Sequence, residues 1–525
     1  MKKLVLKKTA GLIVLLMTIT MLVPIIAFAS AGFQNITSSN GSVSGQVYVS
    51  QDVYDQLKSQ NNSVQVEVYA ENGFHWTIDT TYSNSAAGSV YFDFDVPSNV
   101  YPEYSKLRFN YFYPGSDVIS DVYYDRNYYG SGGYYGGGGS SSGPIVVFEN
   151  GNVDAASLIA ALQADGTATI TTDIETLYLP ANALVGGKSL TIKNSEGVTY
   201  TLPIGALDLR KLADSVGVDL STLVIRVDMK KVTGDDATEV ANAVYKVGES
   251  VAPVYDFNVV AQGSGKEQEV NFGQYVSRQL PLSETVTDTT YNLTGVMFNP
   301  DTNELNFVPT TFATEDGKTT ATLMRNGNSI YTVVNVKPVS FTDMVGNWAQ
   351  KDVTTLASKL IVEGTGANKF EPKRNITRAE FAAMVVRSLG LDASGTASFK
   401  DVASNQWYAG SVAAAADAGI IKGYEDGSFK PNANITRKEV AAMVVRAMAY
   451  AGKDVKLSDA DVSAALAKYT DAASLGWAKA EVAAAIKSGI VLGQTSTQVV
   501  GDANANRAEA ATMIIRFLSN VGFIN

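Results

Sequence analysis

The sequence predicts a multidomain protein with a β-sandwich-like N-terminal domain, a mixed α+β central domain rich in strands, and an all-α C-terminal region. Period-two alternation in the first part, a Gly/Ser-rich break after it and a repeated helix–loop–helix pattern at the end support this division. At 525 residues the chain is too long for one hydrophobic core. The expected segments are a signal peptide (1–31), a β-rich domain (32–127), a linker (128–144), a central domain (145–339) and three repeats (340–392, 398–452 and 468–525).

The first thirty residues have the features of an export signal. Lysines open the chain, an apolar run extends from Ala10 to Phe28, and Ala27-Phe28-Ala29 and Ala29-Ser30-Ala31 offer small residues to a signal peptidase. An uncleaved membrane anchor is the alternative, because the apolar run is long enough to span a bilayer. Pro24 and the small residues favour cleavage. No other segment is sufficiently apolar, so we expect a secreted protein without a membrane span.

The composition excludes several classes of function. There is no cysteine, and His75 is the single histidine, so the chain has no disulfide, no thiolate site and almost nothing for a histidine-based triad or metal site. The formal net charge of −11 makes general binding to nucleic acid unfavourable. We expect no cofactor, no metal site and no catalytic residue, and a local cluster of cations wherever an anionic partner binds.

Strands are predicted throughout the N-terminal domain. Alternating apolar and polar residues occupy Gln46–Val49, Val64–Tyr69, Val90–Val96 and Leu107–Tyr113, and Asn, Gly, Ser and Pro clusters separate these runs. This pattern is typical of a small antiparallel sandwich. Its tyrosines could form a sugar-binding platform, but aromatic residues commonly fill strands, and that interpretation is preferred. The Gly/Ser-rich segment at 130–143 follows as a linker.

The central domain is predicted to mix helix and strand. Asp154 to Leu162 has helical spacing behind an aspartate cap, and Leu223–Val227 and Ile330–Val334 have the composition of strands. Asn299, Asp301 and Asn303 alternate oxygen ligands as a calcium loop does. Such a loop also needs a glycine and a terminal glutamate, which are missing, so a turn between two strands is the better interpretation.

A pattern recurs in the C-terminal third. An aromatic residue precedes Asp343, Asp401 and Asp471 by two positions, and a tryptophan follows each aspartate: Trp348, Trp407 and Trp477. An amphipathic helix then ends at glycine: at Gly364 in the first copy, at Gly419 with Gly423 in the second and at Gly489 with Gly493 in the third. A second helix begins at a predicted capping box: Thr377-Arg378-Ala379-Glu380, Thr436-Arg437-Lys438-Glu439 or Asn506-Arg507-Ala508-Glu509. Each unit is too small to bury its own core, so the copies must pack together.

These residues resemble the S-layer homology (SLH) repeat, whose pattern is F-x-D, W-A or W-Y, G-I-I-x-G, D-G-x-F-x-P and I-T-R-x-E. The second copy matches throughout, including Asp426, Phe429 and Pro431. The first copy has Thr-Gly-Ala-Asn before Phe370 instead of Asp-Gly. The third departs from the loop pattern at 494–502 but keeps Arg507. The segments at 299–309 and 327–331 also resemble sequences found ahead of SLH repeats.

The resemblance implies a pseudo-threefold bundle of three helix–loop–helix repeats in a bacterial, Gram-positive type of surface protein. Its grooves would bind a secondary cell-wall polysaccharide linked to peptidoglycan, commonly one carrying pyruvyl ketals, which are carboxylates. An arginine in the first turn of a helix suits an anion, and tryptophan suits a sugar ring. Glycines would let the backbone approach the ligand. The expected polysaccharide-binding residues are Arg378, Arg437, Arg507, Trp348, Trp407, Trp477, Asp343, Asp401, Asp471, Gly364, Gly423 and Gly493.

Structural roles compete with these binding roles. The threonines, asparagine and glutamates of the boxes are helix caps in any interpretation. The aspartates could cap the first helices, and the tryptophans could be core wedges between repeats. The arginines could form internal salt bridges, although three exposed arginines at one helical position favour ligand binding.

The function that the sequence favours is non-covalent anchoring of a non-enzymatic surface protein to the cell wall, within or beside an S-layer. One alternative is a carbohydrate-active enzyme or wall hydrolase tethered by the same repeats, since a glycosidase needs only two carboxylates. The other is a self-assembling S-layer subunit, whose partners would include other S-layer subunits.

Overall fold

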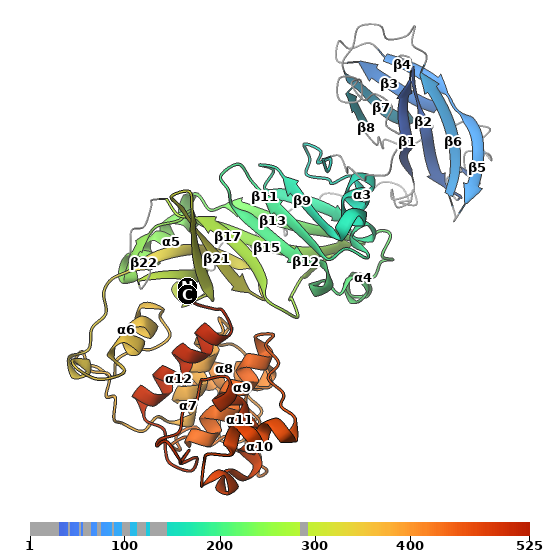
Figure 1. Cartoon of the computed structure of the whole chain (residues 1–525). Helices are drawn as coiled ribbons and strands as arrows, with labels where there is room; N and C mark the ends of the chain where they lie inside the picture. Colours follow the sequence, from blue (N-terminus) through green and yellow to red (C-terminus); the bar gives the residue numbers. More distant parts are fainter. Residues whose placement is uncertain are drawn as a thin grey trace. The chain divides into compact units, whose positions relative to one another are not determined.

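The computed structural model describes residues 31–39, 42–51, 54–55, 65–70, 75–86, 89–96, 106–112, 122–125, 144–283 and 292–525. The predicted signal peptide up to residue 30 and the predicted linker up to residue 143 lie outside these ranges. The chain forms two compact units, residues 1–141 and 142–525 (Figure 1). No helix in the described ranges is long and apolar enough to cross a membrane.

The first unit is built from strands. Over its described residues, two four-stranded antiparallel sheets have the orders β1-β2-β6-β5 and β4-β3-β7-β8. The predicted alternation is present, because Val47, Val49, Val90, Phe92 and Phe94 are buried while the described residues that alternate with them, Gln46, Tyr48, Tyr91 and Asp93, are not. The β-rich character of this domain is therefore confirmed. The strands are β1 (Ala31–Ser39), β2 (Ser42–Ser50), β3 (Gln65–Ala70), β4 (His75–Asp79), β5 (Thr81–Ala86), β6 (Ser89–Val96), β7 (Lys106–Phe112) and β8 (Val122–Asp125).

Two larger sheets form the central part of the second unit (Figure 1). One has the order β20-β21-β17-β12-β11-β9, and the other has the order β10-β13-β15-β22-β18-β19, with β14 on β22 and β16 on β15. The strands are β9 (Thr167–Thr171), β10 (Thr176–Pro180), β11 (Ser189–Lys193), β12 (Thr199–Pro203), β13 (Val224–Lys231), β14 (Gly248–Ser250), β15 (Tyr255–Gly263), β16 (Lys266–Glu269), β17 (Val276–Pro281), β18 (Leu293–Asn299), β19 (Glu304–Phe307), β20 (Thr310–Glu315), β21 (Lys318–Arg325) and β22 (Ser329–Val336).

Helices and short turns accompany these sheets. The predicted helix at Asp154 is α3 (Ala155–Asp165), and the Asp154 carboxylate accepts a hydrogen bond from the Ser157 amide at 2.8 Å. α4 (Leu209–Val216), α5 (Gly234–Val247), and the 3-10 turns η3 (Ala181–Leu184) and η4 (Ile204–Ala206) complete the set. Asn299 and Asn303 lie in a turn between β18 and β19, where the Asn299 side chain accepts from the Asp301 amide at 2.9 Å. The interpretation of this segment as a turn is confirmed.

The C-terminal region is helical, as predicted. The first repeat has η5 (Thr342–Met344), α6 (Gln350–Ser358) and α7 (Arg378–Ser388), and the second has α8 (Ala409–Asp417) and α9 (Arg437–Tyr450). The third has η6 (Ala472–Ala478), α11 (Lys479–Lys487) and α12 (Arg507–Asn520), preceded by the unpredicted helix α10 (Asp459–Leu466). All three capping boxes are present, including the one that begins at Asn506.

The predicted end of the first helix is wrong. α6 ends at Ser358, and the left-handed position after it belongs to Leu360 (φ 56°), whereas Gly419 and Gly489 take that position in the other repeats (φ 69° and 72°). Gly364 lies further along the loop. Leu360 packs against a hydrophobic cluster formed by α5, β18 and β22 of the central sheets, and this contact offsets the cost of its backbone conformation.

Backbone hydrogen bonds join the three repeats in a closed cycle. The Ile376 amide donates to the Ala505 carbonyl, Ala505 donates to Ile435, and Ile435 donates back to Ile376, over 2.9 to 3.1 Å. These residues immediately precede the three capping boxes, so the second helices α7, α9 and α12 start from one ring of backbone. Each repeat thereby satisfies amides that it could not satisfy alone.

The repeats also pack on the central sheets within the second unit. The Tyr275 hydroxyl donates to the Leu389 carbonyl at 2.8 Å, and the buried Arg325 pairs with Asp392 at 2.6 Å. The Thr310 amide donates to the Phe523 carbonyl at 2.9 Å. Phe307 of β19 belongs to the same hydrophobic core as the repeat helices. The central sheets therefore form one packed body with the repeats.

Candidate functional site

The three first-turn arginines are buried, at 4 to 8 % exposure, and the expectation that they are exposed is wrong. Each side chain reaches across to the glutamate of the next capping box. Arg378 Nη1 lies 2.7 Å from Glu439 Oε1, Arg437 Nη1 lies 2.9 Å from Glu509 Oε1, and Arg507 Nη1 lies 3.4 Å from Glu380 Oε1. The cycle of backbone bonds brings each helix start beside the next one, which is why the arginines pair internally.

Backbone carbonyls complete the environment of each arginine. Arg378 Nε donates to the Phe429 carbonyl, Arg437 Nε to Val499 and Arg507 Nε to Phe370, over 2.8 to 3.2 Å. Each guanidinium thus links the cap of one helix to the loop and the cap of a neighbouring repeat. Such a buried pair with satisfied donors fixes geometry, because loss of either partner leaves a charge without compensation.

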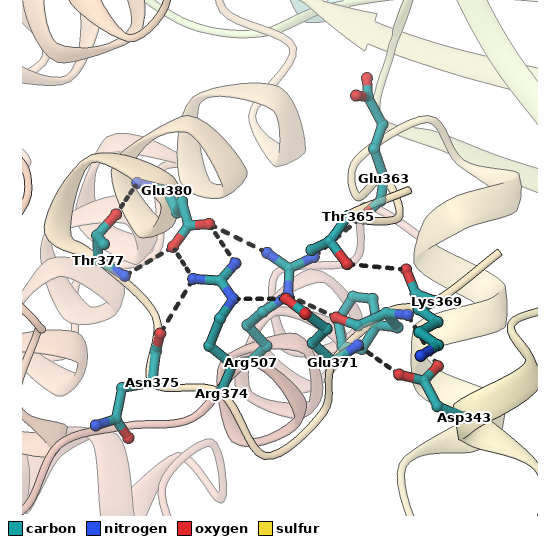
Figure 2. A network of polar contacts seen from close by, with 11 residues as sticks. Asp343, Glu363, Thr365, Lys369, Glu371, Arg374, Asn375, Thr377, Glu380 and Arg507 are labelled. Atoms are coloured by element: carbon teal, nitrogen blue, oxygen red, sulfur yellow. Dashed lines mark hydrogen bonds and ion pairs between the residues drawn. The ribbon is translucent and has the colours of Figure 1, made fainter. Parts of the chain in front are cut away.

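Figure 2 shows the junction between the third and first repeats. Glu380 accepts from Arg374 Nη2 at 2.6 Å, from the Thr377 amide at 2.8 Å and from Arg507. Burial raises the pKa of Glu380, but the hydrogen bonds from Arg374 and Thr377 outweigh it, so the pKa of this carboxyl lies below its usual range. The pKa of Glu439 is lowered in the same way, because the bonds from Thr436 outweigh its desolvation. Both carboxyls are held ionised.

The three aspartates hold loops and do not cap the first helices. Asp343 accepts from the amides of Phe370 and Glu371 at 2.9 and 2.7 Å. Asp401 and Asp471 make the same pair of bonds to two consecutive amides of their own repeats, 2.7 to 3.0 Å long. For Asp343 and Asp471 these bonds outweigh desolvation and lower the pKa of the carboxyl. Each aspartate therefore ties the start of its repeat to the loop before the second helix.

The three loop glycines make room for an aromatic ring. A Cβ on Gly364, Gly423 or Gly493 would lie within 2.9 Å of a ring carbon of Phe341, Phe399 or Tyr469 respectively. These rings are the aromatic residues that open each repeat. In the structure these glycines accommodate a ring of their own repeat, and the approach of their backbone to a ligand stays a prediction.

The tryptophans lie on the surface. Trp348, Trp407 and Trp477 are 66, 63 and 60 % exposed, whereas the residues that follow each of them are buried. The alternative that these side chains are core wedges is therefore wrong. Most of each ring lies in water, where it provides a flat face for an apolar sugar surface.

Sequence reasoning missed two residues at the junctions. Tyr424, which is partly exposed, stacks on the Arg378 guanidinium at 4.7 Å, and Lys430 Nζ lies 4.2 Å from the same ring. Arg374 is partly exposed at the other junction and pairs with both Glu371 and Glu380. Alignment of the three copies would have pointed to both residues, because neither is repeated in the other copies. Thr365 and Gln494 stand where Tyr424 does, and Ala433 and Ala503 stand where Arg374 does, so the three junctions differ in charge and shape.

The site is thus a frame of three linked helix caps with a tryptophan exposed on each repeat. The S-layer homology domain matches residues 340–382, 398–441 and 468–511, and the chain therefore carries three SLH domains. SLH domains bind cell-wall polysaccharide and imply anchoring to the cell wall.

Several relatives share this region. The chain is 30 % identical over 341 residues to an amylopullulanase of Thermoanaerobacterium thermosulfurigenes, covering 64 % of this chain and 16 % of that protein. It is 37 % identical over 185 residues to the exoglucanase XynX of Acetivibrio thermocellus, and this match covers 35 % of this chain and 16 % of that protein. It is 28 % identical over 205 residues to the surface-layer 125 kDa protein of Lysinibacillus sphaericus, and this match covers 38 % of this chain and 17 % of that protein. The chain thus spans less than a fifth of the length of each of these three relatives.

These similarities have two consequences. The 341-residue match is longer than the region of the three repeats, so it extends into the central sheets. The SLH domains and the S-layer relatives place the protein among secreted, cell-wall-associated proteins of the cell surface.

Proposed function

We propose that the three SLH domains anchor this protein non-covalently to an anionic secondary cell-wall polysaccharide, through the three exposed tryptophans. The observation that carries this proposal is that Trp348, Trp407 and Trp477 are 60 to 66 % exposed at equivalent positions of the three repeats, although the residue after each of them is buried. Each ring would stack on a sugar, at about 1 kcal/mol or more per well-formed contact. Repetition along one polymer would multiply these modest contributions.

The carboxylates of a pyruvylated polymer would bind at the junctions between repeats. The buried arginines are already paired with glutamates, so the accessible cations beside them are the better first contacts. Lys430, above the Tyr424 ring, serves the first junction, and Arg374 serves the junction of the third repeat with the first. Arg378, Arg437 and Arg507 would hold this surface in shape and add positive potential beneath it. The closed cycle of contacts supports the predicted pseudo-threefold arrangement of these junctions.

We propose a non-enzymatic role for the chain. The tethered-enzyme alternative is favoured by relatives named amylopullulanase and exoglucanase, but the chain corresponds to only 16 % of each of them. Release of reducing sugars from wall polysaccharide, xylan or pullulan by the purified chain would establish that alternative. The S-layer subunit alternative predicts a regular lattice in electron micrographs of the purified protein, whereas an accessory surface protein gives none.

Co-sedimentation with cell walls tests the anchoring proposal. The full mature chain is mixed with walls before and after removal of their secondary polysaccharide, and with walls whose pyruvyl ketals have been cleaved by mild acid. We expect the protein to pellet with intact walls, to stay in solution with stripped walls and to bind deketalised walls weakly. Equal pelleting with all three preparations would contradict the proposal.

A further inference from the structure

The first repeat differs from the other two at the end of its first helix. The Thr294 hydroxyl of β18 donates to the Ser358 carbonyl at 2.9 Å, and Lys359 Nζ donates to the Leu293 carbonyl at 3.4 Å. Ser358 and Lys359 are both buried by this contact. The residues equivalent to Ser358 are Asp417 and Lys487, and both are exposed. Only in the first repeat, among the described residues, does this helix end lie against the central sheets.

A cavity of about 560 Å³ lies beside this contact. This volume falls within the range of small-ligand sites, roughly 300 to 1,000 Å³. The turn before α6, the exposed side of α6 and the residue that precedes β18 form its walls. The lining residues are Asn292, Asn347, Trp348, Gln350, Lys351, Thr354, Thr355 and Ser358.

The chemistry of the lining is that of a site for a polyhydroxylated ligand. Apart from the indole of Trp348 and the amine of Lys351, every lining side chain is an amide or a hydroxyl, and no carboxylate is among them. Amides and hydroxyls both donate and accept hydrogen bonds, which matches the hydroxyl and acetamido groups of sugars. Trp348 adds an exposed aromatic face at the edge of the cavity.

One polar atom in the lining is unsatisfied. Ser358 is 1 % exposed, and its Oγ has no hydrogen-bond partner in the described part of the chain. Thr355, which lies about one helical turn before Ser358, also lines the cavity. A buried hydroxyl without a partner destabilises a fold, so a residue of this kind at the wall of a cavity points to a ligand group that completes it.

We propose that this cavity is a carbohydrate subsite built jointly by the first SLH repeat and the central sheets, and that it takes one hydroxyl-rich sugar unit of the wall polymer. The sugar ring stacks on Trp348, one of its hydroxyls bonds Ser358 Oγ, and the amide of Asn292 contacts it from the central sheets. This inference rests on the proposed function. It makes the three tryptophan sites unequal and gives the central sheets a part in binding.

Two conservative variants test the subsite in the full mature chain. Ser358→Ala removes the unpaired hydroxyl, and Asn292→Ala removes the contribution of the central sheets. Asn271→Ala is the matched control, because Asn271 lines a different cavity beside α4. Calorimetric titration with muramidase-solubilised wall polysaccharide measures binding, and thermal unfolding checks the fold. Trp407→Ala, in the second repeat, reports on the proposed function independently of the cavity.

We expect each of the two cavity variants to weaken binding by roughly tenfold, as loss of one hydrogen bond does, while Asn271→Ala binds as the parent protein does. Ser358→Ala should unfold at the same temperature as the parent or a higher one. Parental affinity in both cavity variants, with weakened binding in Trp407→Ala, would overturn the subsite and leave the proposed function standing. Absence of binding by the parent protein would contradict both the subsite and the proposed function.

Discussion

Arg507 Nη1 and Glu380 Oε1 lie 3.4 Å apart although 127 residues separate them in the sequence. This contact closes a cycle in which Arg378 pairs with Glu439, and Arg437 pairs with Glu509. Each pair joins the first turn of one helix to the cap of the next. The residues that most resemble a ligand site in the sequence are therefore the ones that hold the three repeats together.

Removal of an arginine should destabilise the repeats. Arg378→Ala leaves the partly buried Glu439 carboxylate without its arginine partner, and we predict a loss of about 3 kcal/mol in the free energy of unfolding. Denaturant titration followed by tryptophan fluorescence measures it, since three of the four tryptophans lie in the repeats. Lys487→Ala is the control, because Lys487 and Asp461 form a solvent-exposed pair and should contribute less than about 1 kcal/mol. Equal, small losses of stability in both variants would show that the cycle of arginine–glutamate pairs does not stabilise the fold.

The junctions between the repeats should lose stability at low pH. The pKa values of Glu380 and Glu439 are lowered in the folded chain, so their stabilisation is present above the pKa of the unfolded state and is lost as the pH falls through the folded pKa. We predict that stability is level near neutrality and declines below about pH 4, where unfolded glutamate titrates. Glu439→Gln should flatten this decline. A decline in stability that begins near pH 6 would contradict this prediction, because it would show that groups other than these glutamates cause the decline.

Lys359 should give a pH dependence on the alkaline side. Burial lowers the pKa of this lysine to about 8 from its ordinary value of 10.5. The unfolded state then binds more protons than the folded state between these values, so stability rises with pH from about 8 to 10.5, by an amount on the order of 3 kcal/mol. Lys359→Met removes the buried amine and keeps an apolar chain of similar length. It should be more stable at pH 7 and show no such rise, and an unchanged rise would contradict this assignment.

The local structure of the repeats follows from the sequence because it depends on neighbouring residues. The capping boxes at Thr377 and Thr436, and the variant at Asn506, need only a hydroxyl or amide and a glutamate three positions later. The alternation in β2 and β6 is likewise a local pattern that one buried sheet face imposes. Such features need no tertiary contact to be predicted.

The burial of side chains could not be predicted in the same way. An arginine at the first turn of a helix is exposed on an isolated repeat, and only the cyclic packing places Arg378 against Phe429 and Glu439. Trp348 gives the converse case, since the sequence leaves open a binding ring and a core wedge, and only the packed structure shows that the side chain is exposed. Leu360, in a left-handed conformation, was missed because its compensation comes from the central sheets.

The anchoring account depends most directly on the exposed tryptophans. Wall co-sedimentation of the full chain carrying Trp348→Ala, Trp407→Ala and Trp477→Ala tests it, with Tyr245→Ala as a control for loss of an exposed aromatic ring in the central part. We predict that the triple variant unfolds at the parental temperature, remains in the supernatant and loses about a hundredfold in affinity, because three rings at about 1 kcal/mol each contribute about 3 kcal/mol. A triple variant that stays folded and pellets with intact walls as the parent does would contradict the account.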